Sequence, residues 1–305
     1  MENKQELKRK IRRFWVGIIW LLLLPFVACE KSIDFDLEEA PPKLVVEATI
    51  ESSEAPRVVL TQSLNYFGVV SPQLLLNSFV RNAEVYVSNG TLTHRLKEYS
   101  VPIAAGITLY YYSTDSASLS TAFTGEEGKA YTLRIISEGK EYNAQTTIPD
   151  FTRKIDSVWW KAPPPNADTG NAIVMVKATD KPGYGDYIRY FTKRNSEGFL
   201  PGLNSVFDDL FIDGTTYELQ VEPGWNRSFE REEEDAFFKR GDTVTLKLSA
   251  IDKATYDFWR TMEYSYASVG NPFSTPVKIA GNISNGALGY FGGYASRYRT
   301  ISIPR

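Results

Sequence analysis

The chain has 305 residues, of which 43% are hydrophobic and 23% charged, and its formal net charge is −3. This length is enough for two domains, although an all-β fold can use more than about 200 residues in one. The acidic balance argues against nucleic acid as a partner, because nucleic acids are bound through an excess of basic residues. Cys29 is the only cysteine, so neither an intramolecular disulfide nor a cysteine-based zinc site can form.

The first 29 residues run from a basic head through an apolar segment to that cysteine. Six basic residues precede Phe14, and the apolar run from Phe14 to Val27 has about 14 residues. This run is shorter than the roughly 20 residues of a transmembrane helix. Ala28 then provides a small residue before the sequence becomes polar. The order predicts a signal peptide over residues 1–28.

The position of Cys29 at the predicted cleavage point resembles the lipobox of bacterial lipoproteins, in which this cysteine is diacylated and becomes the new N-terminus. The usual leucine three residues earlier is Phe26 here, as in the looser lipoboxes of Bacteroidota lipoproteins. We therefore expect Cys29 to carry fatty acyl groups such as palmitate. The chain would then be anchored to the outer membrane, on its periplasmic or its cell-surface face. The alternative is an ordinary signal peptide or an uncleaved anchor.

Residues 29–42 form a predicted acidic tether that ends in Pro41-Pro42. Such a polar segment stays extended and solvated. Glu30, Asp34 and Asp36 match only in part the acidic residues that resemble a surface-export signal in Bacteroidota lipoproteins, because Lys31 and Ser32 interrupt the run. A simple flexible linker is the alternative interpretation.

From Lys43 the sequence alternates between β-branched or aromatic residues and polar ones, and Gly, Pro, Asn and Ser bound each run. This pattern predicts strands, with hairpin turns at 88–90 and 138–140. The spacing predicts an N-terminal β-sandwich of the immunoglobulin or transthyretin-like type over residues 43–150.

A second domain, a C-terminal β domain, is predicted over residues 151–305. Its one different segment begins at Asp252, an expected N-cap, and ends before Gly270. The pattern of this segment predicts a helix near 252–268. The helix is expected to pack on a sheet through residues at helical spacing: Tyr256, Trp259, Met262, Glu263 and Tyr266. The predicted fold class is therefore mainly β, with two β-sandwich-like domains and a single packed α-helix in the second.

The C-terminal region carries a more specific pattern. Asn271-Pro272-Phe273, Pro276, Gly281-Asn282-Ile283 and the run 286–292 resemble the C-terminal signature of domain of unknown function 4249. Further pieces of this resemblance come in the expected order: 43–47, 128–131, 155–157, 213–214 and 241–244. The resemblance implies a Bacteroidota lipoprotein without an established activity, whose gene often lies beside that of a TonB-dependent outer-membrane receptor.

The glycines of this region have a structural explanation. Gly281, Gly286, Gly289, Gly292 and Gly293 lie in strand-like sequence, where glycine indicates bulges, bends or close backbone approach. A phosphate-binding loop would need a strand-to-helix setting instead.

We predict no catalytic residue, no metal site and no cofactor. The single histidine, His94, alternates with leucines in a strand, and no G-x-S-x-G element is present to supply a nucleophile. We interpret the acidic run 230–235 as a solvated loop. Asp213-Gly214, near Asp208 and Asp209, indicates a turn. The alternative of a glycan hydrolase with a pair of catalytic carboxylates stays open, because the separation of two carboxylates cannot be derived from sequence.

Aromatic residues are better candidates for contacts with a ligand or a partner. Trp159 and Trp160 fall on opposite faces of one strand, so at least one is expected to face solvent or a domain junction. Trp225 lies in a turn-like segment. Trp160 and Trp225 are therefore the candidate contacts, with packing in an aromatic core as the alternative.

These observations predict a lipid-anchored, non-enzymatic protein of the cell envelope. It would bind a ligand or a protein partner as an accessory to a TonB-dependent receptor. A surface hydrolase of glycans and a purely structural envelope protein are the alternatives.

The lipid anchor can be tested directly. We expect metabolic labelling with a fatty-acid analogue to mark the wild-type chain, and Cys29→Ala to remove the label, because the thiol is the acyl acceptor. Equal labelling of the two chains would contradict the prediction.

Overall fold

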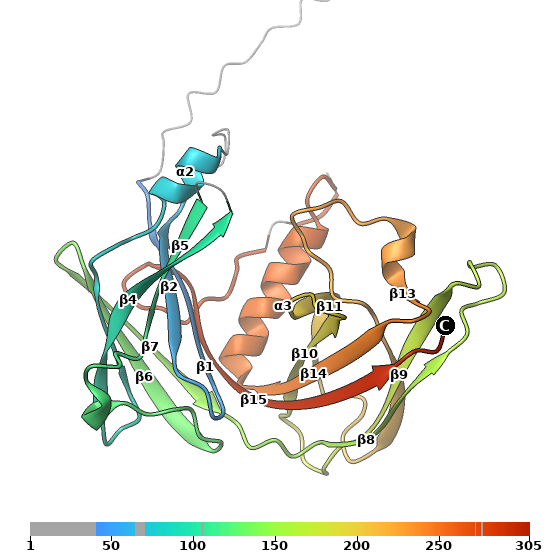
Figure 1. Ribbon diagram of the computed structural model, residues 1–305. Helices are drawn as coiled ribbons and strands as arrows, with labels where there is room; N and C mark the ends of the chain where they lie inside the picture. Colours follow the sequence, from blue (N-terminus) through green and yellow to red (C-terminus); the bar gives the residue numbers. More distant parts are fainter. Residues whose placement is uncertain (1–40, 65–70, 105–106, 272, 276) are drawn as a thin grey trace, which may run out of the picture. The chain divides into compact units, whose positions relative to one another are not determined.

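The structure is a computed structural model that describes residues 41–305 except 65–70, 105–106, 272 and 276 (Figure 1). The predicted signal peptide, Cys29 and the tether up to residue 40 lie outside the described residues, as do Pro272 and Pro276 of the C-terminal signature.

Strands dominate the described chain, and two α-helices and two short 3₁₀ segments accompany them. The first elements are β1 (Leu44–Glu51), β2 (Arg57–Gln62), α2 (Pro72–Asn77), β3 (Glu84–Ser88), β4 (Thr93–Ala104), β5 (Ile107–Ser113), a 3₁₀ segment (Leu119–Thr121), β6 (Lys129–Ser137) and β7 (Lys140–Ile148). The next are β8 (Lys154–Lys161), β9 (Asn171–Thr179), β10 (Tyr187–Arg194), β11 (Leu200–Asp208) and β12 (Thr216–Val221). The last are a 3₁₀ segment (Glu233–Ala236), β13 (Phe238–Lys239), β14 (Thr243–Ile251), α3 (Lys253–Ala267) and β15 (Leu288–Ser302). The mainly β fold class is confirmed, as is the single helix packed near the C-terminus.

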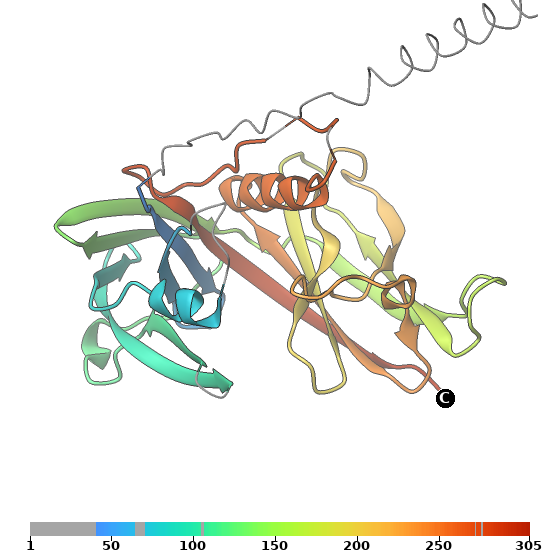
Figure 2. The same ribbon diagram turned by 90° about the horizontal axis from the view of Figure 1, so that it is seen from above.

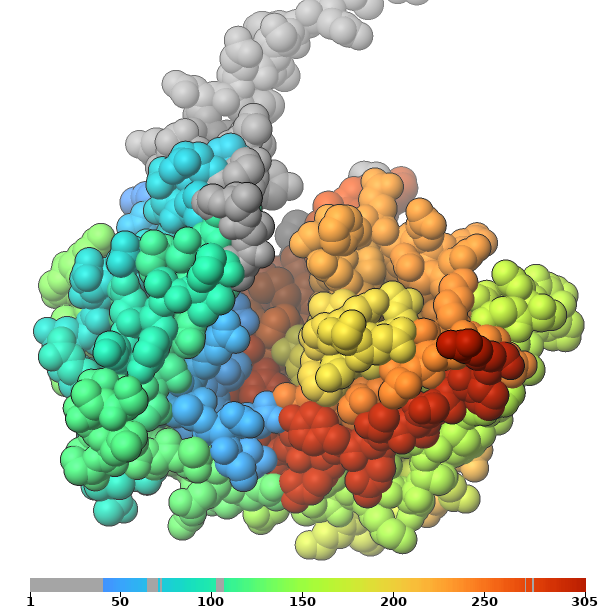
Figure 3. Space-filling model, viewed as in Figure 1, coloured from blue at the N-terminus to red at the C-terminus, as the bar shows by residue number. Residues whose placement is uncertain are grey.

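Eleven strands join in one sheet in the order β11-β10-β14-β15-β1-β2-β5-β4-β3-β6-β7. A smaller sheet has the order β12-β9-β13, and β8 also pairs with β9. β11 is therefore an edge strand, and Figure 3 shows it (yellow) at the surface near the end of β15 (red).

The predicted hairpin turns form where glycine permits a left-handed backbone. Glu138 and Gly139 both have positive φ, at 51° and 73°, and they join β6 to β7. Two consecutive positive φ values are the signature of a type I′ turn, which matches the twist of the flanking strands. Gly90, with φ 88°, lies in the connection between β3 and β4.

β15 connects strands from the two ends of the chain. It pairs in parallel with β1 over Leu288–Tyr294 and antiparallel with β14 over Tyr294–Ser302, so the two pairings together cover its 15 residues. The sequence predicts separate strand-like pieces in this region, whereas the structure has one long strand that begins at Leu288 (Figure 2).

Gly281, Gly289 and Gly293 of this region lie close to other backbone segments, as the sequence predicts, whereas Gly286 has open space around it. A Cβ on Gly281 would lie 2.5 Å from the carbonyl oxygen of Gly289. Gly289 itself has φ 97°, and a Cβ there would overlap the carbonyl oxygen of Val46 in β1. The close β1–β15 pairing therefore requires glycine at this position.

The core is formed by alternating side chains from both sheets. Buried residues include Val46 from β1, Val174 from β9, Leu246 from β14 and Phe291 from β15. The small sheet thus packs against part of the large one, and their facing surfaces form one apolar cluster.

Helix α3 begins at the predicted cap. The Asp252 carboxylate accepts the backbone N–H of Thr255 at 2.8 Å, and its other oxygen accepts the Thr146 hydroxyl at 2.8 Å. The N-cap therefore also ties the helix to β7. Tyr256 and Glu263 of the predicted stripe are buried, and Phe258 joins them, whereas Tyr266 is exposed. The prediction that Tyr266 packs on the sheet is wrong, because its ring meets Trp225 edge-on and its hydroxyl donates to the Arg227 carbonyl, both in the segment after β12.

A buried polar network lies under α3. The Glu263 carboxylate accepts both the backbone N–H and the hydroxyl of Ser205 in β11, at 2.9 and 2.5 Å. The Arg189 guanidinium of β10 donates to the same hydroxyl and lies 3.4 Å from the centre of the Trp259 ring. Hydrogen bonds thus satisfy these buried charged groups and fix the helix on the sheet.

Residues 41–305 cluster as one compact unit. The division into domains 43–150 and 151–305 stays a prediction, and β15 of the second range hydrogen-bonds β1 of the first. No helix in the described part of the chain has the length and apolar character needed to cross a membrane.

We expect Gly289→Ala to lower the free energy of unfolding by about 3 kcal/mol, because the new methyl group meets the Val46 carbonyl while φ stays positive. Urea denaturation measures this loss. The matched control is Gly286→Ala, where φ is 73° but no atom lies within 4 Å, so only about 1 kcal/mol should be lost. Equal losses in the two variants would contradict the role of close backbone approach.

Candidate functional site

A cavity of about 420 Å³ opens between the small sheet and the edge of the large one. Its size falls within the range of about 300–1,000 Å³ that is usual for ligand pockets. Most lining side chains are apolar or aromatic, and they come from β9, β10, β11, β12, β14 and the segment after β11: Val176, Ala178, Tyr190, Asn204, Phe207, Asp208, Phe211, Ile212, Tyr217, Leu219, Gln220, Val221, Glu222, Leu246 and Leu248.

The inner wall of this cavity carries two tyrosines from opposite sheets, Tyr190 of β10 and Tyr217 of β12. Burial raises the pKa of Tyr217 to about 12, and burial also raises the pKa of Tyr190. A tyrosine is already neutral at physiological pH, and these shifts keep both phenols un-ionised at still higher pH. The cavity thus offers neutral hydroxyl groups within an apolar wall.

The mouth of the cavity exposes apolar surface. Phe211 is 91% exposed and Leu219 is 42% exposed, and both also line the cavity. Leu210, beside Phe211, is 59% exposed. Exposed apolar side chains around a concave site are typical of a binding surface.

Arg153 packs behind the aromatic wall of the cavity. Its guanidinium carbon lies 5.6 Å from the ring centres of both Phe207 and Tyr217. The side chain is almost fully buried and forms an ion pair with the buried Asp180, whose Oδ1 accepts from Nε at 2.8 Å and from Nη2 at 2.5 Å. This pair links the cavity wall to the loops beyond it.

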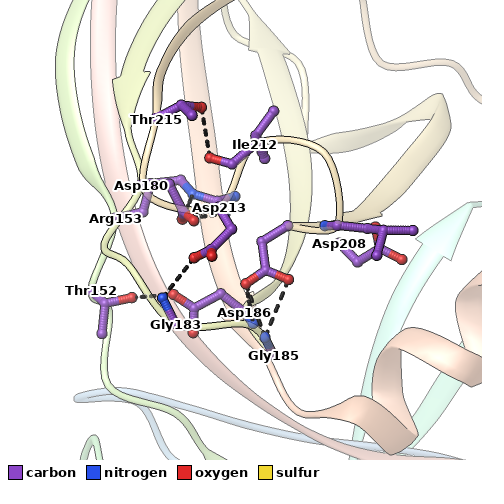
Figure 4. A network of polar contacts seen from close by, with 12 residues as sticks. Thr152, Arg153, Asp180, Gly183, Gly185, Asp186, Asp208, Ile212, Asp213 and Thr215 are labelled. Carbon is purple, nitrogen blue, oxygen red and sulfur yellow. Dashed lines mark hydrogen bonds and ion pairs between the residues drawn. The ribbon is translucent and has the colours of Figure 1, made fainter.

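An acidic cluster lies at those loops: Asp180 follows β9, Asp209 follows β11, and Asp213 precedes β12. One carboxylate oxygen from each residue can be chosen so that all three lie within 4.8 Å of one another. Asp180 and Asp209 are buried, and Asp213 is half-buried. Figure 4 shows Asp180 and Asp213 near the β9–β10 loop.

Backbone N–H groups of the β9–β10 loop hold two of these carboxylates. Gly183 donates to Asp213 Oδ1 at 2.6 Å, and Gly185 and Asp186 donate to Asp209 Oδ2 at 2.9 and 3.1 Å (Figure 4). The turn predicted at Asp213-Gly214 is present, with the Thr215 N–H bonded to the Ile212 carbonyl at 3.0 Å. The three carboxylates are thus fixed by secondary structure and by loop hydrogen bonds.

The two predicted contact residues lie elsewhere. Trp160 in β8 is half-buried against the core, and the Arg240 guanidinium lies 4.3 Å from its ring centre. Trp225 is half-buried and meets the Tyr266 ring edge-on at 5.8 Å. Neither residue is among those that line the cavity, and their role as contacts stays a prediction.

His94 in β4 is buried. Its Nε2 accepts the backbone N–H of Asp115 at 3.0 Å, so the proton of the neutral ring is assigned to Nδ1, which lies 2.9 Å from Thr121 Oγ1. Burial lowers the pKa of His94, which favours this neutral form. The ring therefore links β4 to the segment 115–121.

The acidic run 230–235 forms an exposed segment that enters the 3₁₀ turn Glu233–Ala236, whose capping box joins Glu232 and Asp235.

Sequence reasoning missed both the cavity wall and Asp180. The run Asp180-Lys181-Pro182-Gly183 ends a strand, and this turn signal was the one local indication of a polar loop there.

The comparison with protein families agrees with the C-terminal signature. The model of the domain of unknown function family DUF4249 matches residues 30–300. The chain belongs to this family. The match covers the cavity, the acidic cluster and the described strands except the last two residues of β15, so these features lie within the family domain. No curated protein matches the chain.

Proposed function

We propose that this chain is a lipid-anchored, non-enzymatic protein of the bacterial outer membrane that binds an apolar ligand in the cavity between its sheets. It serves there as an accessory to a TonB-dependent receptor. The observation that carries the binding function is the cavity itself, an apolar space of about 420 Å³ with exposed apolar residues at its mouth.

The composition of the wall favours binding over catalysis. Its polar groups are few, and its two phenols are neutral at physiological pH. Asp208, which lines the cavity, accepts the Tyr256 hydroxyl at 2.9 Å, so one of its carboxylate oxygens already has a partner. A largely apolar pocket with a few placed polar groups is the usual form of a small-molecule site.

The envelope setting rests on the sequence. The basic and apolar leader that ends at Cys29 supports a lipid anchor, and the acidic tether supports a domain held away from the membrane surface. The accessory role rests on the resemblance to Bacteroidota lipoproteins whose genes lie beside receptor genes.

Ligand binding can be tested with a fluorescent apolar probe, N-phenyl-1-naphthylamine, on the mature chain carrying Cys29→Ser so that no lipid competes. We expect saturable binding to the unmodified cavity. Leu219→Glu should weaken it at least about tenfold, because an ionised carboxylate at the mouth would have to be desolvated.

Val101→Glu is the matched control, since Val101 also lies on a strand and is also 42% exposed but does not line the cavity. The affinity of the Val101→Glu variant for the probe should stay within about twofold of the affinity of the parent chain, as expected for a surface change away from the site. Unsaturable binding, or equal weakening by both substitutions, would contradict the proposal.

The accessory role predicts a stable partner. Purification of the chain at native expression levels in mild detergent should recover a TonB-dependent receptor in a constant ratio. Repeated recovery of the chain without a receptor would count against this part of the proposal and would leave ligand binding untouched.

A further inference from the structure

The acidic cluster carries more negative charge than its neighbours balance. Asp180, Asp209 and Asp213 bring three carboxylates together, and Arg153 makes the one ion pair to them within the described part of the chain. Two negative charges therefore remain in a partly buried place. Like charges at such short range repel strongly where water is excluded.

Asp180 supplies an independent sign that a ligand is missing from the cluster. Its side chain has 0% exposure, and both bonds from Arg153 go to Oδ1. The other oxygen, Oδ2, is buried and has no hydrogen-bond partner among the described residues. Because Arg153 occupies Oδ1, Oδ2 is the oxygen of Asp180 that is available to bind a ligand. Buried polar atoms in native proteins nearly always have a partner.

We propose that Asp180, Asp209 and Asp213 bind one divalent cation, and that this cation is Ca²⁺. Carboxylate oxygens are the ligands that Ca²⁺ prefers. A dication would neutralise the two uncompensated charges and would provide the missing partner of Asp180 Oδ2. The proposal goes beyond ligand binding in the cavity and does not depend on it.

The ligand set favours Ca²⁺ over Mg²⁺. Ca²⁺ takes about six to eight oxygen ligands at about 2.3–2.6 Å in a flexible geometry, so three carboxylates from two loops can bind it together. Mg²⁺ usually keeps several waters and is bound through only one or two carboxylates. The three carboxylate oxygens lie within 4.8 Å of one another, which places them within reach of one Ca²⁺ ion. Water would complete the coordination shell.

The site joins two loops, the β9–β10 loop and the segment between β11 and β12, and the second of these contributes to the cavity lining. Asp209 and Asp213 bracket Phe211 and Ile212, both of which line the cavity, and Asp180 holds Arg153 behind the aromatic wall. A bound cation would therefore fix the segment between β11 and β12 against the β9–β10 loop.

Calorimetric titration of CaCl₂ into the full chain, purified in mild detergent and freed of metal with EDTA, tests the proposal. We expect one Ca²⁺ per chain, a dissociation constant of about 10⁻³ M or tighter, and a higher melting temperature in Ca²⁺ than in EDTA. MgCl₂ should bind at least about tenfold more weakly. Saturable Ca²⁺ binding that is absent up to about 5 mM would overturn the site, and equal binding of Mg²⁺ would overturn the choice of Ca²⁺.

Asp213→Asn locates the ion. The amide oxygen can still accept the Gly183 N–H, but the charge is lost, so Ca²⁺ affinity should fall at least about tenfold. The matched control, Asp168→Asn, removes a carboxylate that likewise accepts a backbone N–H, from Gly170 at 2.8 Å, and should bind Ca²⁺ like the wild type.

Wild-type affinity in Asp213→Asn, or an equal loss in both variants, would show that the ion lies elsewhere or binds through overall charge. If Asp213→Asn does not fold, the wild-type titration and its Ca²⁺-dependent melting temperature still decide the proposal.

Discussion

The pairing of β15 with β1 on one edge and with β14 on the other is the constraint on which this structure depends. It places strands from both ends of the described chain in one sheet, and it does so at a distance that only glycine permits at Gly289. The strand is buried along most of its first half, so its side chains also contribute to the core. Helix α3, β10 and the edge strand β11 are positioned by that sheet, and with them one wall of the cavity.

The cavity and the acidic cluster share their supports. Arg153 lies between them, with its guanidinium near two cavity rings and its charge paired with Asp180. The short segment between β11 and β12 likewise presents apolar side chains to the cavity and carboxylates to the β9–β10 loop. Binding in one place and order in the other would therefore be coupled through rigid contacts, because both depend on the position of the same backbone.

Local signals in the sequence predicted the elements whose structure is decided locally. Asp252 as N-cap, the positive φ at Gly139 and the strand alternation all follow from short-range physics, and the structure confirms them. The single long β15 escaped prediction because its continuity comes from pairing with two distant partners. The acidic cluster escaped for the same reason, since Asp180 reaches Asp209 only through the sheet arrangement. Cys29 lies outside the described residues, so the lipid anchor still rests on sequence alone.

The parallel pairing of β1 with β15 also determines when the molecule can finish folding. β1 is the first described strand to be synthesised and β15 is the last, so β1 has an open edge until the whole chain is available. Contacts between such distant segments form slowly, because closing a long loop costs conformational entropy before the contacts can stabilise the chain. A chain of this topology remains unfolded for longer after synthesis than one built from neighbouring hairpins. That delay would keep the chain extended for the export step that the proposed lipid anchor requires.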